Sequence, residues 1–290
     1  MWPPIKRHIL AIMTAFKRLA IWPSLLLITS LLTAPSSYAL PGKCSGGAAL
    51  VEGVRYTCVA KKWQVTTLRG TLVVLAASSL TDVAVDLERA FKRIYPQADL
   101  IFSFGGSGTL AQQAINGVPA DLFLSAGPAP MKLVAEKGAL AGFARDFATN
   151  SLVIAVPKEN PLKISSLSDF SRSKIAICAP EVPCGVLAQN IARVAKISLK
   201  PVTLELNVKS VEAKILLGEV DAGLIYRTDV ISSSRLLGIE IPEAVNLKTI
   251  YSIAPLPSKK SNMNTRDAFI DFLLSNKGKS LLSQAGFAQP

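Results

Sequence analysis

The sequence predicts an α/β protein of two lobes joined by two crossovers, preceded by a small cysteine-stapled β-hairpin. Three observations lead to this prediction. From residue 70 onward, apolar runs of strand length alternate with helical patterns, which is typical of parallel sheets covered by helices. This alternation forms two series, joined near 150–156 and again near 249–256. Residues 40–69 lack the alternation and contain two of the four cysteines.

The first series predicts lobe 1 over residues 70–152 and 251–290. The continuous apolar run 71–76 predicts a buried strand, and residues 79–95 have apolar side chains at helical spacing. The next expected elements are a strand at 100–104, a helix at 109–116, a strand at 121–125, a helix at 128–137 and a strand at 151–156. A returning strand at 250–254 and helices at 265–274 and 278–285 complete this lobe.

The second series predicts lobe 2 over residues 153–250. Its expected strands are 174–178, 202–206 and 222–226, and its expected helices are 185–196, 210–218 and 228–232. Two lobes connected by two strands are suited to closing around a ligand like a hinge.

Residues 1–39 have the pattern of a secretory signal peptide. Four basic residues precede the apolar run 19–33, and Ser37-Tyr38-Ala39 supplies small residues for cleavage before Leu40. The alternative is an uncleaved membrane anchor, but Pro23 interrupts the run, which is shorter than the roughly 20 residues that a spanning helix needs. We expect an exported protein in the periplasm or on the extracytoplasmic cell surface.

Composition excludes several classes of site. The sole histidine, His8, lies in the signal segment, so Ser-His-Asp sites, Cys-His sites and histidine-ligated metal sites are not expected in the exported chain. Removing the four basic signal residues lowers the formal net charge from +12 to +8. The sequence has no basic stripe with interleaved aromatic residues, so we expect no nucleic-acid partner. The positive charge favours attraction of anions.

The four cysteines predict two local disulfides, Cys44–Cys58 and Cys178–Cys184, as the simplest pairings in an exported chain. A site in which all four thiolates bind one metal would require two distant pairs to meet, and neither pair has C-x2-C spacing. The first disulfide would staple a hairpin with strands at 54–60 and 63–68. This unit is too short to have its own core. Three roles are open for it: a spacer, a surface-binding module and inert packing.

Small and polar residues follow several predicted strands at the points where helices begin. Ser78-Ser79 follows the strand at 71–76, and Gly105-Gly106-Ser107-Gly108 follows the strand at 100–104. In the second series, Cys184 and Val208 begin helices, and Tyr226 ends a strand. Ligands of open α/β sheets collect at these carboxyl ends, and helix N-termini attract anions through unpaired N–H groups. The pattern predicts an anion site between the lobes.

Each of these residues has a purely structural alternative. Ser79, with Asp82 three residues later, resembles a capping box, and Ser107 is typical of a cap or turn. Tyr226 taken alone is typical of a half-buried core tyrosine whose hydroxyl has a partner. The functional interpretation depends on their combination at matching strand ends in both lobes.

At these residues the chain resembles the periplasmic molybdate-binding protein family, whose members have the type II solute-binding fold. The resemblance covers about residues 71–290. The matching stretches are Leu75–Thr81, Phe104–Ala111, Gly117–Ala126, Asn150–Val153, Pro180–Gly185 and Ala222–Asp229. They are specific in combination, although none is specific alone.

The resemblance implies a periplasmic-binding-protein-like fold and capture of molybdate or tungstate for an ABC importer. In that family two serine hydroxyls, backbone amides and a tyrosine hold the oxyanion. By motif these fall on Ser79 and Ser107, the amides of Cys184 and Val208, and Tyr226. The resemblance implies no cofactor and no metal ligated directly by side chains, because molybdenum enters as the oxyanion. We expect a monomer that meets a membrane permease.

The chain departs from the family pattern at two positions. Many members have alanine where Cys184 stands, and Asn207 replaces an acidic residue. The expected contact at Cys184 is a backbone N–H, so the side chain need not affect it. Ser78 is an alternative to Ser79 if the register shifts by one residue.

Three other functions fit parts of the sequence. The protein could bind another small oxyanion such as sulfate or thiosulfate, or a carboxylate, although none of the five expected site positions is a lysine or arginine. It could be an enzyme that uses Asp, Glu or Lys chemistry. It could also act as a surface-interaction protein through residues 40–69.

Overall fold

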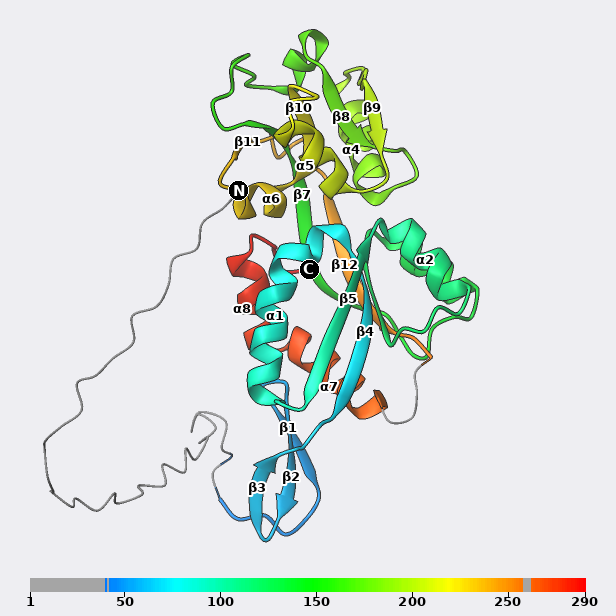
Figure 1. Cartoon of the computed structure of the whole chain (residues 1–290), viewed down its shortest axis with the longest axis vertical. Helices are drawn as coiled ribbons and strands as arrows, with labels where there is room; N and C mark the ends of the chain where they lie inside the picture. The colour runs from blue at the N-terminus through cyan, green and yellow to red at the C-terminus, as the bar shows by residue number, and fades with distance from the viewer. Residues whose placement is uncertain (1–39, 41, 258–261) are drawn as a thin grey trace, which may run out of the picture. The chain divides into compact units, whose positions relative to one another are not determined.

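A computed structural model describes residues 40, 42–257 and 262–290, so the predicted signal segment at 1–39 lies outside the described residues. The two-lobed α/β prediction is confirmed: a nine-stranded mixed sheet has the order β5-β4-β6-β12-β7-β10-β8-β9, with β11 paired to β7 (Figure 1). Among the described residues, no helix combines the length and the apolar character needed to span a bilayer.

Lobe 1 is built around the buried strand β4. This strand pairs in parallel with β5 and β6, and its central residues Leu72 and Val74 are inaccessible to solvent. One face packs against α1, α7 and α8, and the other packs against α2 and α3. The elements are β4 (Gly70–Ala77), η2 (Ser78–Leu80), α1 (Thr81–Ile94), β5 (Ala98–Gly105), α2 (Ser107–Ile115), β6 (Leu122–Ala126), α3 (Pro128–Glu136), α7 (Met263–Leu274) and α8 (Asn276–Gln284).

Lobe 2 repeats the parallel arrangement with β8 at its centre, between β10 and β9. Its elements are η3 (Leu167–Arg172), β8 (Ile175–Cys178), α4 (Pro183–Ala195), β9 (Thr203–Glu205), α5 (Val208–Leu216), β10 (Ala222–Tyr226), α6 (Arg227–Ser232) and β11 (Leu236–Ile239). The sequence analysis did not predict β11. Its four residues are stabilised by antiparallel pairing with β7, a partner distant in sequence, so the local pattern gives no signal.

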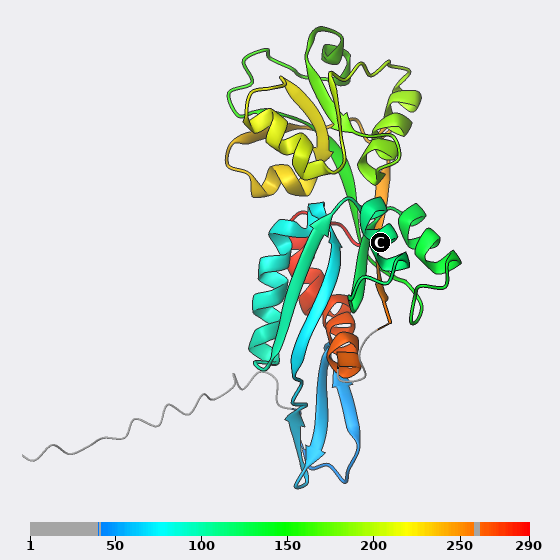
Figure 2. The same cartoon turned by 45° about the vertical axis from the view of Figure 1, so that its right-hand side comes forward.

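Two long strands carry the chain between the lobes, as predicted. β7 (Arg145–Pro157) and β12 (Lys248–Pro255) pair with each other in antiparallel fashion. β7 then continues into lobe 2, where Leu152–Pro157 pairs with β10 and β11. β7 begins six residues before the predicted start at Ser151, because β12 supplies hydrogen-bond partners to a polar stretch that does not resemble a strand. Figure 2 shows both strands passing from one lobe to the other.

The N-terminal unit is a small antiparallel sheet of three strands. The predicted hairpin corresponds to β2 (Val54–Val59) and β3 (Lys62–Val65), and β1 (Ala48–Val51) adds a strand that was not predicted. Both predicted disulfides are present: Cys44–Cys58 closes this sheet, and Cys178–Cys184 joins β8 to α4.

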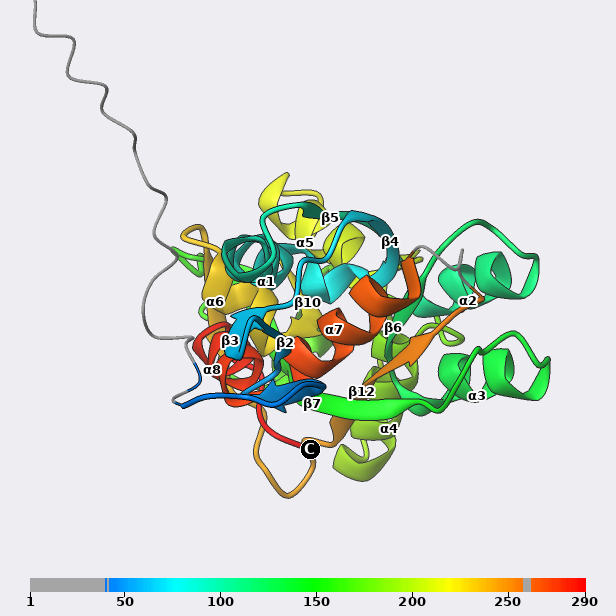
Figure 3. The same cartoon turned by 90° about the horizontal axis from the view of Figure 1, so that it is seen from below.

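The small sheet is anchored to α7, next to which it lies in Figure 3. Arg55 Nη2 lies 2.6 Å from Asp271 Oδ2, and the Arg55 amide donates a hydrogen bond of 2.8 Å to the Tyr95 hydroxyl. Val54 and Tyr56 are buried in the core of lobe 1. The unit therefore has no separate core and shares that of lobe 1, as its length requires.

Substitution of Gly53 tests whether the small sheet is anchored to α7. A β-carbon there would lie 2.6 Å from Ser275 Cβ and 2.8 Å from the Asp271 carbonyl oxygen. We expect Gly53→Ala to lower the free energy of unfolding by about 1–3 kcal/mol more than Gly47→Ala, because the added methyl overpacks the contact with α7. Gly47 is a matched control: both residues have positive φ, but a β-carbon on Gly47 meets nothing within 4 Å. Urea denaturation measures both; equal losses would contradict the anchoring.

Candidate functional site

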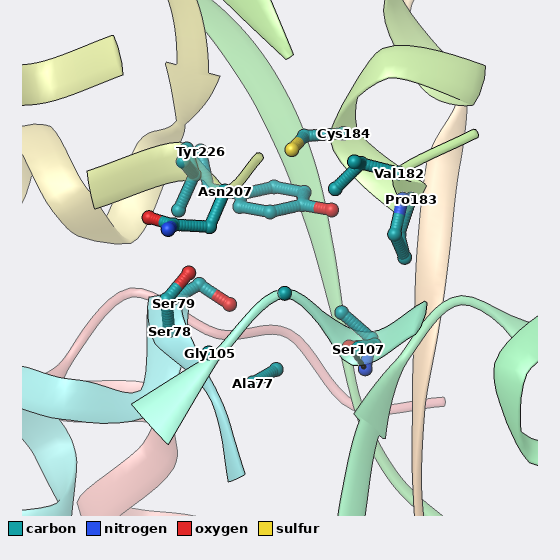
Figure 4. Close-up of a pocket in the computed structure, with 13 residues that line it drawn as sticks. Ala77, Ser78, Ser79, Gly105, Ser107, Val182, Pro183, Cys184, Asn207 and Tyr226 are labelled. Atoms are coloured by element: carbon teal, nitrogen blue, oxygen red, sulfur yellow. Dashed lines mark hydrogen bonds between the residues drawn. The ribbon is translucent and has the colours of Figure 1, made fainter. Parts of the chain in front are cut away.

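A small cavity lies between the lobes where the predicted strand ends meet. All five residues expected at the site line it, with Ser79 and Ser107 contributed by lobe 1 and Cys184, Val208 and Tyr226 by lobe 2 (Figure 4). The remaining lining residues are Ala77, Ser78, Gly105, Gly106, Ala126, Val182, Pro183 and Asn207. None of the described residues that line the cavity carries a charged side chain.

Helix N-termini surround the cavity. α2 begins at Ser107, α4 at Pro183 and α5 at Val208, and the 3-10 helix η2 begins at Ser78. The first turn of a helix has N–H groups without intrahelical acceptors and a partial positive charge. The amides of Cys184 and Val208 belong to such first turns, and Asn207 caps α5 by accepting a hydrogen bond from the Ser210 amide at 3.0 Å. The predicted convergence of helix ends is present.

Neither site serine caps a helix, so the capping interpretation is wrong for both. The Ser107 hydroxyl oxygen instead accepts a hydrogen bond from the Ala126 amide, at 3.0 Å. The Ser79 hydroxyl pairs with the Tyr251 hydroxyl at 2.7 Å. Because a backbone N–H can only donate, the hydroxyl hydrogen of Ser107 remains available to a ligand. When the Tyr251 hydroxyl donates to the Ser79 oxygen, the hydroxyl hydrogen of Ser79 is also available to a ligand.

Tyr226 is 2% exposed, so it is fully buried rather than half-buried. Its hydroxyl makes no hydrogen bond of good geometry with any described residue, although Tyr251 is a neighbour at a ring-centroid distance of 6.0 Å. Burial raises the pKa of Tyr226 well above its usual value, and Tyr251 and Asp229 add to this shift. The hydroxyl therefore stays protonated. A buried hydroxyl without a partner is unfavourable, and an acceptor atom placed in the cavity would relieve this cost.

Tyr251 is a site-supporting residue that the sequence analysis missed. It lies on the connecting strand β12, is inaccessible to solvent, and contacts both Ser79 of lobe 1 and the Tyr226 ring of lobe 2. Burial is the main cause of its raised pKa. The pattern around residue 251 predicts only a strand, so no local signal indicates this contact.

The backbones of the two lobes touch beside the cavity. A β-carbon on Gly106 would lie 2.4 Å from the Leu206 carbonyl oxygen of the other lobe. Glycine at this position is therefore needed for the close approach. A β-carbon on Gly108, in the first turn of α2, would meet nothing within 4 Å, so this position is not restricted in the same way.

Asp229, three residues after Tyr226 and within α6, is a buried carboxyl group. Lys209 Nζ lies 3.1 Å from its Oδ1, yet neither carboxyl oxygen makes a hydrogen bond of good geometry with the described residues. Burial raises the pKa of Asp229 to about 7 despite the opposing effect of Lys209. Among the described residues, no group of three or more His, Cys, Asp or Glu side chains is arranged to hold a metal ion.

Comparisons with known proteins identify the family of this chain. Residues 72–288 match the family described as bacterial extracellular solute-binding protein. The molybdate-binding protein ModA of Mycobacterium tuberculosis is 37% identical over 223 residues, covering 76% of this chain and 85% of that protein. The substrate-binding domain of a putative molybdenum ABC transporter from Clostridium difficile is 27% identical, with a TM-score of 0.59, covering 76% of this chain and 99% of that chain.

A more distant structure shows the fold alone. The sulfate-binding protein SubI from Mycobacterium tuberculosis has a TM-score of 0.66 at 15% identity, covering 76% of this chain and 87% of that chain. The match to the family begins at residue 72, so the small N-terminal sheet lies outside it.

The raised pKa of Asp229 predicts that the stability of the folded protein depends on pH. Its folded pKa of about 7 exceeds the roughly 3.9 of an unfolded aspartate, so between these values the folded chain holds a proton that the unfolded chain has lost. Stability contributed by this group is greatest below pH 4 and falls by about 1.4 kcal/mol per pH unit up to pH 7. We expect Asp229→Asn to remove this slope. Urea unfolding from pH 4 to 8 measures the difference between the two proteins, and a difference independent of pH would contradict the prediction.

Proposed function

Because the chain belongs to the bacterial extracellular solute-binding protein family, we propose that it captures molybdate or tungstate and delivers the anion to an ABC importer. The observation that carries this proposal is the cavity between the lobes, which presents hydrogen-bond donors and no charged side chain. The ligand contacts proposed are the hydroxyls of Ser79, Ser107 and Tyr226 and the amides of Cys184 and Val208.

The direction of the hydrogen bonds supports a fully ionised anion. The Ser107 oxygen already accepts a backbone N–H, and Tyr226 has a hydroxyl without a hydrogen-bond partner among the described residues. Each can donate to a ligand oxygen. A ligand that carried its own hydrogen would face donors on all sides, leaving an unmatched polar contact that costs about 1–3 kcal/mol. Tetrahedral dianions such as molybdate and tungstate meet this requirement.

Closure of the lobes supplies the second half of the contacts. In the proposed cycle the anion first meets Ser79 and Ser107 on lobe 1. The lobes, with boundaries proposed at 152/153 and 250/251, then close about β7 and β12. This brings in Cys184, Val208 and Tyr226. The anion favours the closed form only to the extent of the contacts that it makes there and not in the open form.

Export and a membrane partner complete the proposal. The signal pattern at 1–39 would direct the chain out of the cytoplasm, and the closed, loaded monomer would dock on the importer's permease. No catalytic step is needed, and the exported residues 40–290 contain no histidine to serve as a general base at neutral pH. Sulfate, the alternative ligand, shares the charge and shape of molybdate but is smaller, so rigid donors would contact it less well.

Titration calorimetry with molybdate, tungstate and sulfate tests this function. We expect the wild type to bind molybdate and tungstate more tightly than sulfate. Tyr226→Phe should weaken molybdate binding by about 1–3 kcal/mol, because one donor is lost. The same change should leave the ligand-free protein as stable or more stable, because it removes a buried hydroxyl that makes no hydrogen bond of good geometry with the residues that the structure describes. Tightest binding of sulfate would refute the assigned ligand, and an unchanged affinity of Tyr226→Phe would refute the assigned site.

Gly106 tests whether closure is needed for binding. We expect Gly106→Ala to weaken molybdate binding at least tenfold, equivalent to about 1.4 kcal/mol, because the new β-carbon would collide with the Leu206 carbonyl oxygen and hold the lobes apart. Gly108→Ala is the matched control, since its β-carbon would enter open space. Calorimetry gives both affinities. If the two variants bind equally well, binding does not require this approach of the lobes.

A further inference from the structure

A second contact joins the lobes beside the cavity, through side chains that do not line it. Asp82 on α1 of lobe 1 accepts two hydrogen bonds on its Oδ2 atom from lobe 2. One comes from Lys209 Nζ on α5 at 2.7 Å, and the other comes from the Ser232 hydroxyl on α6 at 2.6 Å. We refer to Asp82, Lys209 and Ser232 as the interlobe bridge.

The interlobe bridge is linked through the chain to the proposed ligand contacts. Asp82 follows Ser79 by three residues, and Lys209 directly follows Val208. Ser232 ends α6, the helix that starts immediately after Tyr226. A ligand that draws these segments together therefore also brings the members of the bridge within hydrogen-bond distance.

Both charged members of the bridge are ionised in the closed form. Burial works to lower the pKa of Lys209, but Asp229, Asp82 and Glu212 together raise it above its usual value. For Asp82, burial works to raise the pKa, and the hydrogen bonds from Lys209 and Ser232 outweigh it, so the pKa is lowered. Ionised partners make stronger hydrogen bonds than neutral ones.

The bridge can open without leaving a buried charge unpaired. Lys209 also contacts Glu212 at 2.8 Å and Asp229 at 3.1 Å, and both of these belong to its own lobe. When the lobes separate, Lys209 keeps these two partners. Asp82, whose side chain is 44% exposed even in the closed form, passes into water. The contact therefore favours closure by a moderate amount and does not prevent opening.

We propose that Asp82 is a positioning residue that holds the lobes closed after the oxyanion has bound and slows its release, without touching the oxyanion. This inference rests on the proposed function. The open protein would meet its ligand before the bridge forms, so the bridge slows dissociation from the closed form and takes no part in the encounter itself. It also acts on the ligand-free protein, whose closed form it stabilises in the same way.

The test compares Asp82→Asn with Asp86→Asn. Asp86 lies one turn further along α1, is 57% exposed, and pairs with Arg89 of the same helix, so the control removes the same charge without affecting the bridge. Dissociation of radiolabelled molybdate is followed after a chase with excess unlabelled molybdate, and calorimetry gives the affinity. We expect release from Asp82→Asn to be faster by on the order of tenfold, and association to be no slower than in the wild type. Asp86→Asn should match the wild type.

Two further measurements make the result decisive. Ser232→Ala removes one of the two hydrogen bonds of the bridge, from the side of lobe 2 and without altering α1, so it should speed release by a smaller factor. Small-angle scattering of the ligand-free proteins should give a larger radius of gyration for Asp82→Asn than for the wild type. Equal release rates for Asp82→Asn and Asp86→Asn would overturn the inference. If the wild type bound no oxyanion, the proposed function would fail. In that case, equal radii of gyration for ligand-free Asp82→Asn and wild type would show that the bridge does not hold the lobes closed.

Discussion

An anion buried without a cationic side chain depends on hydrogen-bond donors whose hydrogens are not already used. The cavity between the lobes meets this condition through hydrogen bonds within the protein. The Ala126 amide donates to the oxygen of Ser107, which leaves the Ser107 hydrogen for the ligand, and the Ser79 hydrogen is free in the same way when Tyr251 donates to Ser79. Helix first turns add N–H groups under the same constraint, because their intrahelical acceptors do not exist. The polarity of the site is thus set by hydrogen bonds within the protein.

The sequence was sufficient for the parts of the site that depend on local pattern. Ser79 and Ser107 follow apolar runs, Cys184 follows Val182-Pro183 at a helix start, and Tyr226 ends a strand, so each could be placed from its neighbours. Tyr251 could not, because its contacts come from the pairing of β12 with two other strands. The early start of β7 at Arg145 and the existence of β11 were missed for the same reason. Contacts between residues far apart in sequence determine these features.

The small N-terminal sheet shows how an addition can be attached to a fold of fixed architecture. It lies outside the residues that match the family, yet Val54 and Tyr56 enter the core of lobe 1, and Arg55 pairs with Asp271 of α7. The small sheet contacts helices at the side of the nine-stranded sheet, whereas the cavity lies at the carboxyl ends of the strands of that larger sheet. The sheet can therefore vary between relatives without changing the residues that line the cavity.

The pairing of β7 with β12 limits how the lobes can move. Two strands bonded to each other behave as a ribbon, which bends readily about an axis in its plane but resists sliding, because sliding would break several backbone hydrogen bonds at once. A single flexible linker would allow the lobes to rotate freely and lose their alignment. Because the ribbon guides the motion, the lobes open and close along the same path. The hydrogen-bond donors of the two lobes therefore take up the same relative positions each time the lobes close.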